Sequence, residues 1–298
     1  MRGLKVRAVS GVLLLAGVLL AIWLRGPLLM LVVGVAAALA AHEFFGIVRR
    51  AGYAPLYTAG VPLALLLGMR AYLGGDIFSG TPSVISGTAT ESVVLVLVLL
   101  LVLARQGFGW ARATTAGVNI DQGGVPRSPY LAWADIGFTL GGALYTGGLI
   151  GYAPLLAALP VTATSAGGTY WLLLVLLGTA ACDTGAYLVG STLGRHKMIP
   201  HISPGKTWEG LVGGVAGAVI AATSLSGLLK ISLGEAVALG LLICAAAVSG
   251  DLCESLLKRA AGVKDSGHLI PGHGGILDRI DSILFVLLAV YWFVQVHG

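Results

Sequence analysis

Long apolar runs separated by short polar breaks dominate the pattern of hydrophobic and polar positions along the chain. A run of about 20 apolar residues is long enough to cross the hydrocarbon core of a bilayer as a helix. Several breaks contain glycine or proline, among them Gly26-Pro27 and Gly123-Gly124. The pattern predicts an all-α, polytopic membrane protein with about nine spans, at residues 6–24, 28–48, 56–73, 92–104, 136–159, 169–193, 208–229, 233–250 and 280–296.

The basic residues predict how these helices are oriented. Loops on the cytosolic side of a membrane are enriched in Lys and Arg. With a cytosolic N-terminus and one crossing per run, every one of the 18 basic residues falls on the cytosolic side except Arg25, Arg70 and Lys230. We therefore expect a cytosolic N-terminus and an external C-terminus. The basic residues and the apolar run that follows them could be a signal peptide, but no small-residue cleavage site stands out, so an uncleaved first helix is expected.

Composition excludes several other classes of protein. The chain is 57% hydrophobic and only 10% charged, whereas a soluble domain carries about a quarter charged residues. The net charge of +5 is explained by topology-setting Lys and Arg, and no nucleic-acid-binding motif is visible, so no nucleic-acid partner is expected. The three cysteines form no CxxC pair, which favours buried packing residues over a disulfide framework.

Polar side chains are distributed unevenly, which divides the chain in two. Residues 1–135 are interpreted as N-terminal helices with a cytosolic loop, and residues 136–298 as the catalytic region. Most groups suited to chemistry lie in 182–210 and 250–281, on the predicted cytosolic side. His42 and Glu43 also fall near that side, but they fit packing or headgroup contacts equally well and stay without an assigned role.

The segment 250–259 places three polar side chains at helical spacing. If it is helical, Asp251, Ser255 and Lys258 share one face. A carboxylate, a hydroxyl and an ammonium together could hold a metal and phosphates. The alternative is a helix end whose charges extend into the lipid headgroups.

Two acids precede the last apolar run. Asp278 and Asp281 are three residues apart and share a face. Paired carboxylates resist ionising together unless a cation lies between them, and Mg²⁺ prefers carboxylate and phosphate oxygens. Placed opposite Asp251, Asp278 would complete a site for a metal-bridged triphosphate. The alternative, acids favoured by the helix dipole, explains one acid but not this many ionisable groups.

Two segments nearer the middle of the chain add candidate binding residues. Asp183 lies within an apolar run, where a carboxylate is costly and is by default a functional candidate, and Tyr187 follows one turn later. A polar anchor for helix packing is the alternative. The sequence 203–209 resembles a phosphate loop, but Pro200 stands where a Walker motif needs glycine. A P-loop ATPase is excluded, and Ser203 and Lys206 remain candidates for triphosphate contacts.

The glycine-rich stretch 271–275 could bring backbone N–H groups close to an anion. His273 within it could bind phosphate or carry a proton. Taken alone, the stretch is equally consistent with an ordinary polar loop.

These residues together resemble a known signature. The order Ser255-x-x-Lys258-Arg259, Lys264-Asp265 and His273-Gly274-Gly275-x-x-Asp278-Arg279-x-Asp281 resembles that of the phosphatidate cytidylyltransferases, also called CDP-diacylglycerol synthases. The segments 182–187 and 203–210 are similar to this family too. Gly205 departs from the Lys found in many members. The specific resemblance covers about residues 181–281, and the N-terminal half matches only as apolar helices.

The resemblance implies transfer of CMP from CTP to phosphatidic acid, giving CDP-diacylglycerol and pyrophosphate with Mg²⁺. It implies Asp251 and Asp278 as metal ligands, to which Asp281 is added, and Ser255 and Lys258 as further catalytic residues. The expected substrate-binding residues are Asp183, Tyr187, Ser203, Lys206, Arg259, Lys264, His273, Gly274, Gly275 and Arg279. The expected setting is a bacterial inner or plasma membrane among membrane lipids, with a cytoplasmic active site; a second cation and a homodimer stay open.

Two rival functions make different predictions. A CTP-dependent polyprenol or phytol kinase would transfer the γ-phosphoryl group and release CDP, and the full signature argues against it. A transporter with an ion site at Asp183 would show an inverted repeat and charges on both sides, neither of which is seen. A structural scaffold would leave the polar groups of 250–281 without a purpose.

Overall fold

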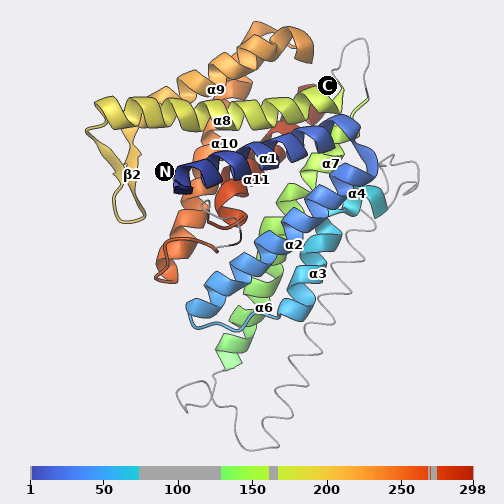
Figure 1. Cartoon of the computed structure of the whole chain (residues 1–298), viewed down its shortest axis with the longest axis vertical. Helices are drawn as coiled ribbons and strands as arrows, with labels where there is room; N and C mark the ends of the chain where they lie inside the picture. Colours follow the sequence, from blue (N-terminus) through green and yellow to red (C-terminus); the bar gives the residue numbers. More distant parts are fainter. Residues whose placement is uncertain (1, 74–128, 161–166, 268, 270–273, 298) are drawn as a thin grey trace, which may run out of the picture.

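Figure 1 shows the computed structural model, which describes residues 2–73, 129–160, 167–267, 269 and 274–297. The described chain is mostly helical. Two short strands, β1 (Lys197–Ile199) and β2 (Ser203–Thr207), lie between α8 and α9. The helices are α1 (Arg2–Leu24), α2 (Gly26–Arg50), α3 (Tyr57–Gly68), α4 (Arg70–Leu73), α6 (Pro129–Ala143), the π-helix η1 (Leu144–Gly148), α7 (Tyr152–Ala157), α8 (Gly168–Leu193), α9 (Trp208–Leu229), α10 (Leu233–Ala260) and α11 (Leu277–His297).

Several helices are suited to a membrane, as the apolar runs predict. Two shorter apolar helices, Leu14–Leu24 and Tyr57–Gly68, fall in the predicted runs 6–24 and 56–73. The predicted span 92–104 lies outside the described residues. The count of nine and the orientation of the N-terminus therefore stay predictions. Within the described residues, six helices are long and apolar enough to cross a bilayer: Gly26–Arg50, Leu131–Ala157, Gly168–Leu193, Trp208–Leu229, Leu233–Ala260 and Leu277–His297.

The described chain is mostly helical, as the all-α prediction expects, and contains one β-hairpin besides. Strands β1 and β2 pair antiparallel in the polar segment between α8 and α9. Local hydrogen bonds hold its base: the Glu209 carboxylate accepts the backbone N–H of Arg195 at 3.1 Å, and the Thr207 hydroxyl accepts that of Gly210 at 3.1 Å. Thr207 thereby caps α9, since a helix N-terminus leaves its first N–H groups without helical partners.

Helix α10 is longer than the predicted span 233–250, because the polar segment after it continues the same helix. Its start is fixed by a capping box in which the Ser232 and Glu235 side chains each accept a backbone N–H of the other residue. Its 28 residues extend about 42 Å at 1.5 Å per residue, beyond a hydrocarbon core of about 30 Å. The polar C-terminal turns can therefore leave the apolar layer without ending the helix.

The helices form two packed groups that meet along α11. In the first group, α8 and α10 each contact α9 and α11. Helices α2, α3, α6 and η1 form the second group, and α11 also contacts α2 and α7 (Figure 1). Small residues bring α8 and α9 into close contact. A Cβ on Gly185 would lie 2.3 Å from the Gly213 carbonyl oxygen, and one on Gly217 would lie 2.2 Å from that of Ala181. Such small-residue contacts are typical of helix pairs in membranes.

The proposed division between residues 135 and 136 falls inside α6. It stays a prediction, although the described structure offers no break in the backbone at this point.

Candidate active site

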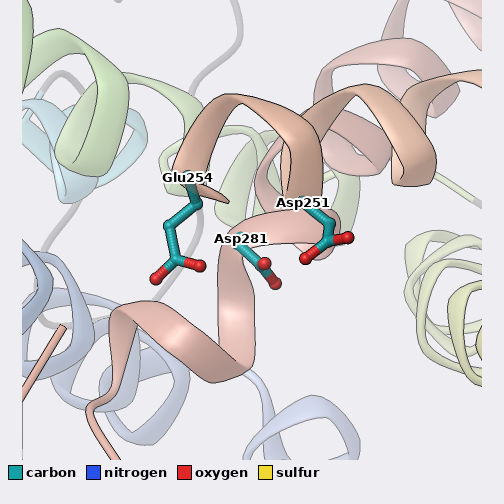
Figure 2. A group of neighbouring side chains, drawn as sticks. All are labelled: Asp251, Glu254 and Asp281. Atoms are coloured by element: carbon teal, nitrogen blue, oxygen red, sulfur yellow. The ribbon is translucent and has the colours of Figure 1, made fainter. Parts of the chain in front are cut away.

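Three carboxylates converge where α10 crosses the start of α11. Figure 2 shows Asp251 and Glu254 projecting from α10 toward Asp281 on α11. One carboxylate oxygen from each residue lies within 4.8 Å of the other two. Asp251 and Glu254 can meet the same partner because residues three apart on a helix share a face. These residues are the acidic triad.

The acidic triad is largely shielded from solvent. Glu254 is 1% exposed and Asp281 is 8% exposed, whereas Asp251 is half-buried. Among the described residues, the Glu254 Oε1 atom is buried without a hydrogen-bond partner. Buried polar atoms are nearly always paired, and like charges at this separation repel one another. The oxygens of the acidic triad are close enough together to hold a cation.

Asp278 makes a different set of contacts. Its Oδ1 atom lies 2.7 Å from Lys258 Nζ, and its Oδ2 atom accepts the backbone N–H groups of Ser266 at 3.0 Å and Gly275 at 2.9 Å. The same Lys258 ammonium lies 2.5 Å from Glu254 Oε2. Lys258 thus bridges Asp278 and Glu254, so Asp278 borders the acidic triad without being one of its three converging acids.

A cavity of about 320 Å³ opens beside the acidic triad, between α8, the hairpin and the start of α9. Asp183, Tyr187, Ser203 and Lys206 line it together with Asp251. Lys206 forms an ion pair with Asp251, which belongs to both the cavity and the acidic triad. Most ligand sites in proteins are concave pockets of this kind, with a few polar groups that orient the ligand. The cavity and the acidic triad therefore form one continuous site.

The remaining predicted residues are placed less closely around this centre. Arg259 Nε donates to the Ile202 carbonyl at 3.1 Å, which ties the end of α10 to the hairpin. Ser255 is half-buried on α10, and Lys264 and Arg279 are exposed. His273 lies outside the described residues.

Gly274 and Gly275 shape the loop that leads into α11. Gly274 has a φ of 81°, a conformation that residues with a Cβ rarely adopt. A Cβ there would also lie 2.9 Å from Asp278 Oδ2. The two glycines therefore allow the backbone to wrap closely around the Asp278 carboxylate.

The sequence reasoning assigned no role to two acids of the site. Glu254 could have been found from its position three residues after Asp251 on the same helix. Glu43 on α2 could not, because the residues it contacts lie more than 200 positions later in the chain. Its carboxylate accepts the backbone N–H of Leu277 at 2.8 Å and the hydroxyl of Ser266 at 3.1 Å.

Comparison with known proteins agrees with the resemblance read from the sequence. An uncharacterized protein, YnbB of Escherichia coli K12, is 43% identical over 147 residues, which cover 49% of each chain. Phosphatidate cytidylyltransferase 5, chloroplastic, of Arabidopsis thaliana is 48% identical over 133 residues, 44% of this chain and 33% of the relative. Phosphatidate cytidylyltransferase of Haemophilus influenzae is 45% identical over 122 residues, 39% of this chain and 42% of the relative.

These alignments span at most about half the length of the relatives. A profile of the cytidylyltransferase family, in contrast, matches residues 5–297, nearly the full length of this sequence. The chain belongs to the cytidylyltransferase family.

Proposed function

We propose that this protein is a phosphatidate cytidylyltransferase. The observation that carries the proposal is the junction of the acidic triad with a cavity that contains Lys206 and Asp251, in a membrane protein of the cytidylyltransferase family. The names of the relatives from Arabidopsis and Haemophilus support phosphatidate as the acceptor.

In the proposed reaction, a phosphate oxygen of phosphatidic acid attacks the α-phosphorus of CTP. A new oxygen–phosphorus bond forms, and the bond from the α-phosphorus to the oxygen shared with the β-phosphorus breaks. Its electron pair leaves with pyrophosphate. The nucleophile is already anionic, so the protein needs no covalent intermediate. Catalysis then consists of positioning the two substrates and neutralising the charge that accumulates between them.

The acidic triad has the donor chemistry that Mg²⁺ requires. Magnesium prefers a few carboxylate oxygens supplemented by substrate phosphates and water. The buried Oε1 of Glu254, which has no hydrogen-bond partner in the described part of the chain, supplies a further oxygen donor. Asp251, Glu254 and Asp281 would hold the ion, which when bound neutralises phosphate charge. Asp278 was predicted as a ligand from the sequence, but its carboxylate is occupied by Lys258 and would bind a metal only after that ion pair opens.

We assign the cavity to the triphosphate. Lys206 supplies a cation, and Ser203 and Tyr187 supply hydroxyl groups along its wall. In the free protein Lys206 is paired with Asp251. An incoming triphosphate would take over Lys206 while a cation takes over Asp251, so nucleotide and metal binding would reinforce each other.

The membrane location suits a lipid acceptor. Leu188 on α8 and Val212 on α9 are large, exposed apolar residues, and each directly follows a residue that lines the cavity. Exposed apolar side chains of this kind are expected to face lipid. Phosphatidic acid could therefore keep its acyl chains in the bilayer while its phosphate enters the site. The distribution of basic residues favours a cytoplasmic site. The relatives from bacteria favour a plasma membrane.

The direct test is incubation of the purified protein with CTP labelled at the α-phosphorus, phosphatidic acid and Mg²⁺. Labelled lipid that disappears on adding EDTA is the expected result. Lys206→Met should raise the KM for CTP, whereas Lys230→Met, a basic residue at the far end of α9, should not. Phosphorylated lipid from γ-labelled CTP would instead identify a kinase. No transfer of either label by a folded protein, with several lipids tried, would reject the enzyme assignment.

A further inference from the structure

We propose that Glu43, on α2, is a positioning residue for the reaction, acting on Asp278 and the acidic triad through the start of α11. This proposal rests on the proposed function, because it concerns the same site. Glu43 is 7% exposed and lies among core residues of the N-terminal group of helices. A carboxylate in such a position is costly to bury unless its oxygens are satisfied by donors.

The donors come from the segment that carries the active-site acids. Glu43 Oε1 accepts the Ile276 N–H at 3.0 Å, and Oε2 accepts the Leu277 N–H at 2.8 Å and the Ser266 hydroxyl at 3.1 Å. Ile276 and Leu277 lie at the beginning of α11, where backbone N–H groups have no helical partner and a negative charge is favoured. Glu43 therefore caps α11 from another part of the chain.

Ser266 connects this cap to the catalytic groups. Its hydroxyl donates to Glu43, while its backbone N–H donates to Asp278 at 3.0 Å. Asp278 in turn holds Lys258 at 2.7 Å, and Lys258 lies 2.5 Å from Glu254. A continuous path of hydrogen bonds and ion pairs thus runs from Glu43 to the acidic triad.

Glycines make room for the Glu43 carboxylate. A Cβ on Gly275 would lie 2.4 Å from Glu43 Oε2 and 2.1 Å from Ser266 Oγ. A Cβ on Gly267 would lie 2.6 Å from Glu43 Oε1. The backbone at Gly267 and at Gly275 therefore lies too close to the Glu43 carboxylate to leave room for a side chain at either position. This close fit indicates a specific binding site for the carboxylate.

The donors around Glu43 explain why this position needs two acceptor oxygens. In Glu43→Gln one oxygen becomes an NH₂ group that would face a backbone N–H, so one donor would meet another donor. The start of α11 would then shift or open. Asp281 lies one turn further along α11, so its position relative to Asp251 would change as well.

Asp135 provides a matched control. It is a buried carboxylate, 2% exposed, and it accepts the backbone N–H of Ala54 at 2.6 Å. It therefore has the same chemical role as Glu43 in the N-terminal group of helices, but away from the acidic triad. Asp135→Asn reports what the loss of a buried structural carboxylate does on its own.

The decisive activity measurement is the Mg²⁺ concentration that gives half-maximal transfer of α-label to lipid. This value does not depend on the fraction of enzyme that is folded. Because changes in groups that orient metal ligands typically cost 10–100-fold, Glu43→Gln should raise it about tenfold, with a smaller rise for Ser266→Ala. Asp135→Asn should leave it unchanged. Equal values for wild type and Glu43→Gln would overturn the proposal.

Amide hydrogen exchange tests the cap independently of catalysis. Glu43→Gln should speed exchange in 274–280, whereas Asp135→Asn should speed it near residue 54. If exchange changes in this way but the wild type transfers no label, the proposed function fails and the cap stands. If the wild type is active and exchange in 274–280 is unchanged in Glu43→Gln, the positioning role is rejected.

Discussion

The two groups of helices use their buried residues differently. In the N-terminal group, aromatic residues such as Phe44, Phe45 and Tyr57 pack edge to face. In the C-terminal group, glycines bring α8 and α9 into close contact, and charged groups gather at the ends of α10 and α11. The first arrangement supplies a rigid framework, and the second leaves space and polar groups for chemistry. Glu43 connects the two groups, because it lies on α2 and binds the loop and the start of α11 beside the acidic triad.

The largest effect should follow from neutralising the acidic triad. Asp281→Asn removes a charged donor that the proposed cation needs, so label transfer should fall on the order of 10²–10³-fold. Glu235→Gln is the control, because Glu235 is a carboxylate of α10 at its other end, in the capping box. Activity that survives in Asp281→Asn at saturating Mg²⁺ would remove Asp281 from the site.

A smaller effect, on the half-saturating Mg²⁺ concentration, should distinguish the role of Glu254 from that of Asp278. If the acidic triad holds the cation, Glu254→Gln should raise the half-saturating Mg²⁺ concentration more than Asp278→Asn does. Asp278→Asn should act chiefly by releasing Lys258, its partner at 2.7 Å. Mg²⁺ titrations of transfer and Mn²⁺ binding to the purified variants measure the difference. The reverse order would restore Asp278 as the metal ligand predicted from the sequence.

The smallest effect on chemistry should come from the framework. Phe45 is fully buried, and Phe45→Ala would leave a cavity that costs about 3 kcal/mol if the surroundings relax little. The melting temperature in detergent should fall, while the half-saturating Mg²⁺ concentration stays the same. A change in metal dependence comparable to that of Glu43→Gln would show that any disturbance of the N-terminal group reaches the site. The distinction between a structural N-terminal group and a catalytic C-terminal group would then fail.

Much of the architecture could be read from local sequence. The apolar runs predicted the six described helices that could cross a membrane, because length and hydropathy alone decide whether a helix suits a bilayer. The spacing of Asp251, Ser255 and Lys258 placed them on one helix face, and the extension of α10 to Ala260 agrees with that condition. Both inferences depend on residues close together in the chain.

Only the tertiary structure decided which polar groups meet. Asp281 faces Asp251 and Glu254, whereas Asp278, three residues earlier, turns to Lys258 and the loop. The 197–207 hairpin was not predicted either, although the contacts that close its base, such as the one to Glu209, are local. Glu43 is the clearest case, because helical periodicity carries no information about a partner 234 positions away. Contacts of that kind arise when helices pack, and hydropathy and spacing do not encode how they do so.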